Sequence, residues 1–194
     1  VPNPFRWIIT KIISSRRAPI AREIYGQIGN KSPILEETYK QRDALEITLN
    51  HNSRDEFKCF VFMRYWHPFA KEIVGEVKSY TPDEIILLPL YPQYSVTTTA
   101  TGLIEWNKFA QKEIKSIPYR VIKEYPDANF FVDTIADLAR EKINSLDDKS
   151  EYRLLLSAHG LPKKTIESGD PYQKQVEKTC IAIMSKLENE NLEH

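Results

Sequence analysis

Two histidines stand where a side chain that exchanges protons or binds a metal would be useful. His159 follows an apolar run and precedes Gly160, and His67 follows another apolar run and precedes Pro68. A neutral imidazole near pH 7 accepts a proton and ligates divalent transition metals. The two histidines form no HExxH or HxH pattern, so their spacing predicts no dedicated metal centre. From position alone a structural role stays open for both, and His159 is the stronger candidate for chemistry.

Aromatic, basic and hydroxyl side chains gather after the same apolar runs. Arg64–Trp66 follows the first run, and Tyr91 opens the segment after the second. If the runs are parallel strands, their carboxyl ends meet at one edge of a sheet, where open α/β sheets bind ligands. Such a wall suits a large, flat, apolar ligand with polar appendages. Ser95 and Thr97–Thr99 are expected to cap the helix that follows.

Short apolar runs alternate with helical patterns through most of the chain. The runs show little alternation, as expected for strands buried on both faces, and recur about every 30 residues, the length of a βαβ unit. They predict strands at Cys59–Met63, Ile85–Leu90, Tyr119–Ile122 and Tyr152–Ser157. Helical spacing predicts helices at Pro2–Ile13, Pro19–Gln27, Pro33–Asn50, Phe69–Ser79, Thr98–Ser116, Asn129–Ser145 and Pro171–Asn189. The alternation predicts an α/β fold with a parallel sheet covered by helices.

Composition limits the function. The 194 residues carry 27 basic and 27 acidic side chains, and this zero net charge argues against a general nucleic-acid binder. The longest apolar runs are far too short to span a bilayer. Cys59 and Cys180 form no CxxC, so we expect small buried hydrophobes in a reducing compartment. No motif for a dinucleotide or a nucleoside triphosphate is present.

Four segments together resemble one enzyme family. Leu154–Lys174 reads LLLSAHGLPKKTIESGDPYQK and is similar to the signature of ferrochelatases, which insert Fe2+ into a porphyrin late in haem synthesis. Three further segments fit in family order: YGQIGNKSP at Tyr25–Pro33, MRYWHP at Met63–Pro68 and LYPQYSVTT at Leu90–Thr98. The resemblance covers essentially the whole chain. It implies the insertion of Fe2+ into protoporphyrin IX to form protohaem.

The resemblance also implies an architecture of Rossmann-like parallel sheets flanked by helices. Residues 1–146 correspond to a first Rossmann-like domain whose opening strand is missing, and residues 147–194 to the start of a second domain. By resemblance, the essential acidic partner of His159 lies outside this chain, as do the cysteines that hold an iron–sulfur cluster in some members. No cofactor is implied for the chemistry of this chain, in which Fe2+ is a substrate. We therefore expect the 194-residue chain alone to be inactive.

Each site residue implied by the resemblance falls in one of the four segments or just before the first. His159 would meet the pyrrole nitrogens, either taking a proton or ligating the arriving metal. Arg64 and Tyr65 would lie on the opposite side of the macrocycle, and Tyr91 would form a wall of the cleft. The porphyrin propionates would be bound by Arg17, Tyr25 and Ser32. Arginine suits a carboxylate because its planar fork donates to both oxygens.

The loop before Pro33 departs from the glycine-rich form found in the family. Asn30 and Lys31 lie between Gly29 and Ser32. Lys31 would add a propionate contact, or Asn30 would take the left-handed turn that glycine takes elsewhere.

The first residues combine basic side chains with Trp7 and several isoleucines. A basic helix with an apolar face is typical of membrane-surface segments, and equally of a helix packed on its own domain. In the family this region faces the membrane, which implies a peripheral contact through residues 1–15. We expect the protein in the cytoplasm, with a peripheral contact to the inner membrane. In a eukaryote this contact would be on the matrix side of the mitochondrial inner membrane.

Two alternatives remain beside the enzyme. One is a porphyrin- or metal-binding module without turnover. The presence of an acidic partner for His159 would indicate an enzyme instead of such a module. The other is a related chelatase that inserts another metal into a tetrapyrrole. The segments Ser157–Pro162 and Gly169–Tyr172 argue against that second alternative, because they resemble ferrochelatases specifically.

Overall fold

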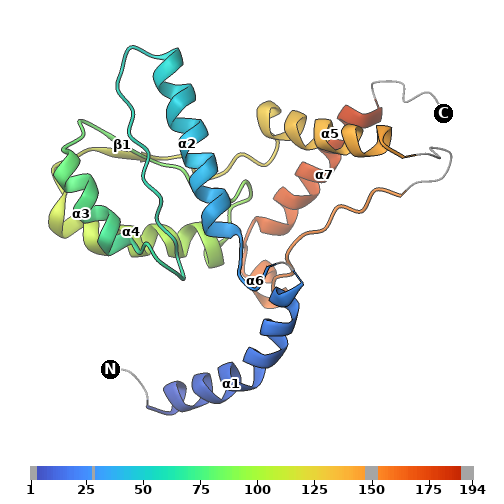
Figure 1. Ribbon diagram of the computed structural model, residues 1–194, viewed down its shortest axis with the longest axis horizontal. Coiled ribbons are helices and arrows are strands. Elements are labelled where there is room, and N and C mark those ends of the chain that lie inside the picture. The colour runs from blue at the N-terminus through green and yellow to red at the C-terminus, as the bar shows by residue number, and fades with distance from the viewer. Residues whose placement is uncertain (1–3, 28, 147–152, 189–194) are drawn as a thin grey trace. The chain divides into compact units, whose positions relative to one another are not determined.

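The computed structural model describes residues 4–27, 29–146 and 153–188 (Figure 1). The chain forms two compact units, one that ends at Val61 and one that begins at Phe62. Both units contain helices, and the second also holds a small parallel sheet. The predicted boundary at 146/147 falls where the described residues stop, so that division stays a prediction. None of the helices in the described ranges is long and apolar enough to cross a membrane.

The first unit consists of α1 (Pro4–Gly26) and α2 (Ile34–Asn52). The prediction of two separate helices before residue 28 was wrong, because α1 continues through Pro19. A proline removes one backbone donor, and the neighbouring alanines and arginines are good helix formers that sustain the remaining hydrogen bonds. Between the helices Asn30 adopts φ 63° and donates its N–H to the Tyr25 carbonyl at 2.7 Å. Of the two alternatives for this loop, the left-handed turn at Asn30 is observed.

Side chains of α2 hold the chain that follows it. The carboxylate of Glu46 accepts the Cys59 N–H at 2.6 Å and Lys58 Nζ at 3.1 Å. Asn50 accepts the Phe57 N–H and donates to the Phe57 carbonyl. The N–H of Cys59, followed by hydrogen bonding from Lys58, holds the pKa of Glu46 below its usual range. The backbone here is therefore bonded to side chains instead of to a neighbouring strand.

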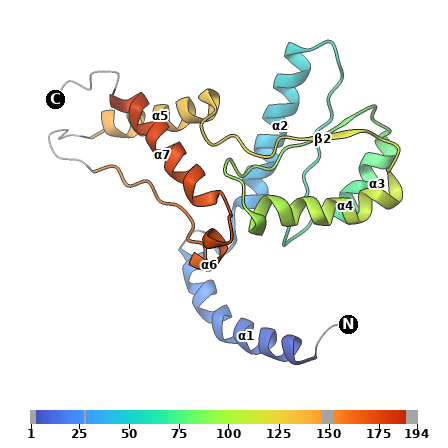
Figure 2. The same cartoon turned by 180° about the vertical axis from the view of Figure 1, so that it is seen from behind.

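The second unit contains a two-stranded parallel sheet beside two helices. Strand β1 (Ile85–Leu87) pairs with β2 (Tyr119–Val121) in the register Ile85 to Tyr119. Helix α3 (Ala70–Tyr80) packs on α4 (Thr101–Glu113), which follows a wide π turn at Val96–Ala100. The parallel pairing and the helices of the predicted α/β class are confirmed (Figures 1 and 2).

Two predicted strands are absent from the described residues. Cys59–Met63 is irregular because the N–H of Cys59 is taken by Glu46 and that of Met63 by the Pro68 carbonyl. The described part of Tyr152–Ser157 is also irregular, while Tyr152 lies outside the described residues. Leu155 is 79% exposed, so this segment is not a strand buried on both faces.

A second pair of helices completes this unit. Helix α5 (Asn129–Asn144) packs on α7 (Tyr172–Glu188), and the short α6 (Lys163–Glu167), which the sequence did not predict, precedes α7. Buried side chains recur four residues apart on α7, and four and seven residues apart on α5, which places them on one face of each helix. The core between them consists of Val132, Ala136, Ile183 and Leu187.

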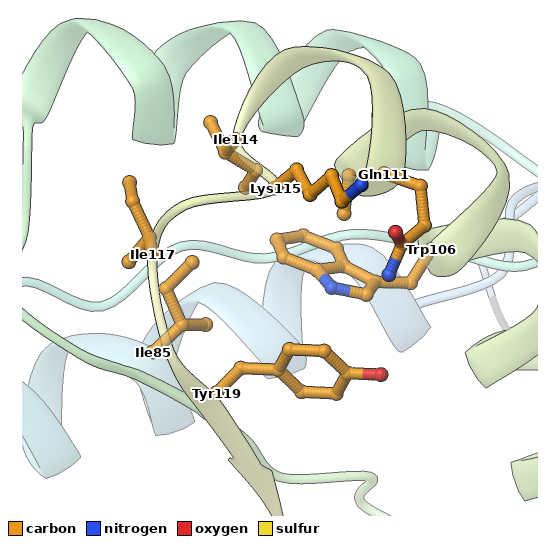
Figure 3. A pocket seen from close by; sticks show the side chains of 8 residues that line it. Ile85, Trp106, Gln111, Ile114, Lys115, Ile117 and Tyr119 are labelled. Atoms are coloured by element: carbon orange, nitrogen blue, oxygen red, sulfur yellow. The ribbon is translucent and has the colours of Figure 1, made fainter.

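The sheet and α4 enclose a small crevice around Trp106 (Figure 3). The indole is 2% exposed and lies over the ring of Tyr119, with Ile85 and Ile114 beside it. The crevice measures about 10 Å³, room for one water at most. It is a packing defect of the core and cannot hold an organic ligand.

Candidate functional site

His159 lies in an irregular segment between the core and α6. Leu154 packs on the α5–α7 core, whereas Leu155 and the residues up to Gly160 are exposed. Among the described residues His159 makes no hydrogen bond or ion pair. The described residues also contain no group of three or more His, Cys, Asp or Glu side chains placed to hold a metal. The imidazole is therefore free to meet a ligand from solvent.

The segment that begins at His159 ends at a buried carboxylate. Asp170 is 7% exposed and follows Gly169, whose φ of 95° is unfavourable for residues with a Cβ. Asp170 Oδ2 accepts the hydroxyl of Ser95 at 2.9 Å and the N–H of Val96 at 2.8 Å. Its Oδ1 accepts the N–H of Tyr172 at 2.9 Å. The carboxylate thus joins the start of α7 to the loop that follows β1.

Side chains of helix α7 make further hydrogen bonds at this edge. Gln175 accepts the Tyr94 N–H at 2.7 Å and donates to Glu124 at 2.7 Å. The hydroxyl of Thr179 donates to the Pro126 carbonyl at 2.6 Å and accepts from Gln93 at 2.9 Å. The segments that follow β1 and β2 are therefore both bonded to one face of α7. For the segments after β1 and β2, this arrangement agrees with the prediction that strand-end segments meet at one edge.

An open groove of about 500 Å³ lies along this edge. Its volume falls in the range of small-molecule sites, roughly 300–1,000 Å³. One side comes from the loop after β1 and the other from the segment around α6. The lining residues are Tyr94, Val96, Pro162, Lys164, Thr165, Ser168, Gly169, Asp170 and Pro171. Tyr91 and His159 do not line the groove, although each lies three residues before a residue that does, Tyr94 and Pro162.

Tyr91 and its neighbours differ in burial. Tyr91 is 45% exposed, and its hydroxyl makes no hydrogen bond among the described residues. Tyr125, in contrast, donates its hydroxyl to the Pro89 carbonyl at 3.1 Å, and burial raises the pKa of its phenol. Ser95 is 1% exposed and accepts the Thr97 N–H, which confirms its predicted capping role. Tyr91 is therefore open to a ligand, as is Tyr94, which lines the groove.

The loop that carries Arg64 and Tyr65 is anchored at the start of α3. The guanidinium of Arg64 lies 4.9 Å from the centre of the Tyr65 ring, and its buried Nε has no hydrogen-bond partner within the described ranges. Tyr65 is 71% exposed. His67 Nδ1 lies 2.8 Å from Glu72 Oε1, and Glu72 also accepts the Phe69 N–H. His67 therefore has a structural partner.

Two contacts of Glu72 affect its ionisation. The N–H of Phe69, followed by the hydrogen bond with His67, holds the pKa of Glu72 below its usual range. The carboxylate is thus charged at neutral pH and favours both contacts.

The predicted propionate ligands all lie in the first unit. Arg17 and Tyr25 are exposed on α1, and Ser32 is exposed in the turn before α2, where its hydroxyl accepts the Ile34 N–H at 3.4 Å. Lys31 pairs with Glu36 at 3.2 Å. Tyr25 and Ser32 therefore lie at or just beyond the C-terminal end of α1, whereas Arg17 lies in the interior of that helix.

Sequence reasoning missed the residues that organise the groove. Asp170 was noted only as part of a motif, although an aspartate followed by proline at a helix start is an N-cap signal. Gln175 and Thr179 carry no signal in the sequence, because polar residues at these helix positions are usually solvated. Their roles depend on the fold that brings α7 against the loops.

Comparison with known proteins gives one family. The sequence model of the ferrochelatase family matches residues 1–194. The chain is 44% identical over 193 residues to the ferrochelatase of Wolbachia sp. subsp. Drosophila simulans, covering 100% of this chain and 61% of that protein. It is 43% identical to the ferrochelatases of Pelagibacter ubique and Rickettsia felis, covering 100% of this chain and 56% and 55% of those proteins. The chain thus spans somewhat more than half the length of these relatives.

Proposed function

Because the chain belongs to the ferrochelatase family over all of its 194 residues, we propose that the full-length protein inserts Fe2+ into protoporphyrin IX to give protohaem. The observation that carries this proposal is the exposed, unbonded imidazole of His159 inside the segment SAHG, within an unbroken family match. The substrates follow from this activity: protoporphyrin IX and Fe2+.

Metal insertion requires the two pyrrole N–H protons to leave while the nitrogen lone pairs turn toward the metal. His159 is placed to receive a proton or to ligate the arriving Fe2+, since a neutral imidazole does both. A positioned base contributes roughly 10²- to 10⁴-fold in rate. Arg64 and Tyr65 would act on the other face of the macrocycle. Arg64 Nε is buried and has no acceptor in the part of the chain that the structure describes, which supports a ligand contact there.

The propionates would be bound by residues of the first unit. Arg17 supplies the charge, and Tyr25 and Ser32 supply hydroxyl donors. Tyr91 would contribute an apolar wall against the ring, since its side chain is half exposed and unbonded. These assignments give every polar group of the porphyrin a partner of suitable chemistry.

The direct test is an anaerobic assay with the full-length protein, protoporphyrin and Fe2+. We expect porphyrin fluorescence to disappear over many turnovers as the metal enters the ring. A binding module would instead quench fluorescence once, in proportion to protein, and then stop. Parallel assays with Co2+ and Ni2+ distinguish a chelatase that serves another metal.

Arg17→Leu is expected to weaken porphyrin binding more than it slows the chemical step. A hydrogen bond to a charged group is worth about 1.5–3 kcal/mol, so KM for porphyrin should rise about 10- to 100-fold. Steady-state kinetics at saturating Fe2+ measure the effect. Arg22→Leu, an equally exposed arginine of α1, is the matched control. An unchanged KM in Arg17→Leu would remove Arg17 from the propionate site.

We also propose that α1 makes a peripheral membrane contact from the cytoplasmic side. Its exposed apolar side chains include Trp7 at 64% and Ile9 at 55%, and Lys11 Nζ lies 4.9 Å from the Trp7 ring. Exposed apolar residues interleaved with cations suit the interface of an anionic bilayer. Of the proposed segment 1–15, residues 1–3 lie outside the described residues.

The double variant Trp7→Glu and Ile8→Glu is expected to abolish most vesicle binding. Each buried side chain of this kind contributes about 1.5–3 kcal/mol, so losing two should lower the partition coefficient by more than 100-fold. Flotation with vesicles that contain phosphatidylglycerol measures the bound fraction. Ile47→Glu makes the same change at an isoleucine of α2 that is 71% exposed. Equal flotation of all proteins would contradict the membrane contact.

A further inference from the structure

We propose that Asp170 is a positioning residue that holds the segment after His159 against the loop after Tyr91, and so sets the porphyrin-binding edge. The inference rests on the proposed function, which supplies the porphyrin. It assigns a role to a carboxylate that touches neither the macrocycle nor the metal in the proposed mechanism.

The contacts of Asp170 bring together parts of the chain that are far apart. Ser95 and Val96 donate to one carboxylate oxygen from 75 and 74 positions away, and Tyr172 donates to the other. Both Asp170 and Ser95 are buried. Hydrogen bonds to an ionised acceptor are about twice as strong as neutral ones, and a buried donor left without an acceptor is costly. The carboxylate therefore fixes the loop firmly.

The groove shows what this contact controls. Tyr94 and Val96 line one side of it, and Pro162 and Thr165 line the other. Asp170 lies in the lining and bonds across to the loop through Ser95 and Val96. The width of the groove thus depends on this carboxylate.

The loop that carries Tyr91 is held at several points. Next to Tyr91, the Tyr125 hydroxyl donates to the Pro89 carbonyl at 3.1 Å and the Tyr125 N–H donates to the Pro92 carbonyl at 2.8 Å. Farther along, Gln175 accepts the Tyr94 N–H and Asp170 accepts the Val96 N–H. Of these two acceptors, Asp170 is the carboxylate and receives two donors from the loop. Loss of Asp170 should therefore release the loop at Ser95 and Val96, beside the groove, while Tyr125 keeps Tyr91 in place.

The experiment uses Asp170→Asn, Asp170→Ala and Ser95→Ala in the full-length protein. Asparagine keeps the shape and one acceptor oxygen, so we expect KM for porphyrin to rise about threefold in Asp170→Asn and at least tenfold in Asp170→Ala. Ser95→Ala removes one of three donors and should raise KM about threefold. Asp127→Ala is the matched control, because its carboxylate pairs with Lys178 of α7 at the exposed surface, at 2.7 Å. That variant should leave KM unchanged.

Two readouts separate positioning from mere stability. Hydrogen exchange should become faster at the amides of Tyr94–Thr97 in the Asp170 variants, and KM should rise among molecules that remain folded by circular dichroism. A purely structural role would reduce the yield of folded protein and leave KM unchanged, which would overturn the proposal. If Asp170→Ala does not fold, Asp170→Asn and Ser95→Ala decide by the same criteria.

The outcome also separates this inference from the proposed function. If the wild-type protein neither binds nor metallates porphyrin, the proposed function fails and the inference fails with it as a statement about porphyrin. If the wild type is active and exchange at Tyr94–Thr97 is unchanged in Asp170→Asn, only the inference is wrong.

Discussion

Replacing His159 with alanine is expected to lower iron insertion by the full-length protein about 10²- to 10⁴-fold. The imidazole is the exposed, unbonded group of the SAHG segment, and either role, base or metal ligand, is lost with it. Porphyrin affinity should change by no more than about threefold, because binding relies on propionate contacts and aromatic walls elsewhere. Stopped-flow metal insertion and fluorescence titration of the porphyrin measure the two quantities separately.

A matched control for this variant is His51→Ala. His51 is an exposed histidine of α2 whose Nδ1 lies 3.3 Å from its neighbour Asn52, so its removal should leave both quantities unchanged. Near-normal turnover in His159→Ala would mean that another group takes the pyrrole protons. A large loss of porphyrin affinity would instead assign His159 to ground-state binding.

Two helices of the second unit could be predicted well because their signal is local, whereas the ends of α4 were predicted three residues too far out and α6 was missed. The periodic apolar residues of Phe69–Ser79 and Asn129–Ser145 placed α3 and α5 within one residue at each end. The prediction divided helix α1 into two at Pro19, which was wrong. A proline weakens a helix, but it does not always end one.

The strands could be predicted only in part. Apolar runs at Ile85–Leu90 and Tyr119–Ile122 contain β1 and β2. The equally apolar run at Cys59–Met63 is not a strand, because a strand requires a neighbour to complete its ladder. Here Glu46 of α2 takes the N–H of Cys59 instead.

The candidate site shows the same division between local and distant signals. The cap at Ser95 and the left-handed turn at Asn30 depend on residues next to one another; the cap was predicted, and the turn was one of two alternatives for its loop. The contact of Asp170 with Ser95 joins residues 75 positions apart, and Gln175 reaches Tyr94 over 81. The sequence near Asp170 and Gln175 does not indicate these partners, because it is the packing of α7 that brings them into contact.

Several large apolar side chains of the 194-residue chain are exposed. Phe130 of α5 is 70% exposed, Leu155 is 79% exposed and Ile181 of α7 is 68% exposed. Large apolar side chains left in water favour association with other surfaces. His159 lies near this region in sequence and has no carboxylate partner among the described residues.

We therefore expect the 194-residue chain alone to insert iron no faster than the reaction without protein. It spans only 61% of the Wolbachia relative, and the described residues offer no cluster of His, Cys, Asp or Glu side chains that would capture Fe2+. By resemblance, the acidic partner of His159 lies in the part of the relatives that the 194 residues do not span, and among the described residues no carboxylate orients the imidazole. The porphyrin would also lose whatever contacts that remaining part of the protein makes. Binding should accordingly be weak or absent. The test compares the purified 194-residue chain with the full-length protein under anaerobic conditions, following loss of protoporphyrin fluorescence after addition of Fe2+. Insertion by the short chain well above the protein-free rate would show that His159, Arg64 and Tyr65 suffice, and that the remainder of the protein is dispensable for chemistry.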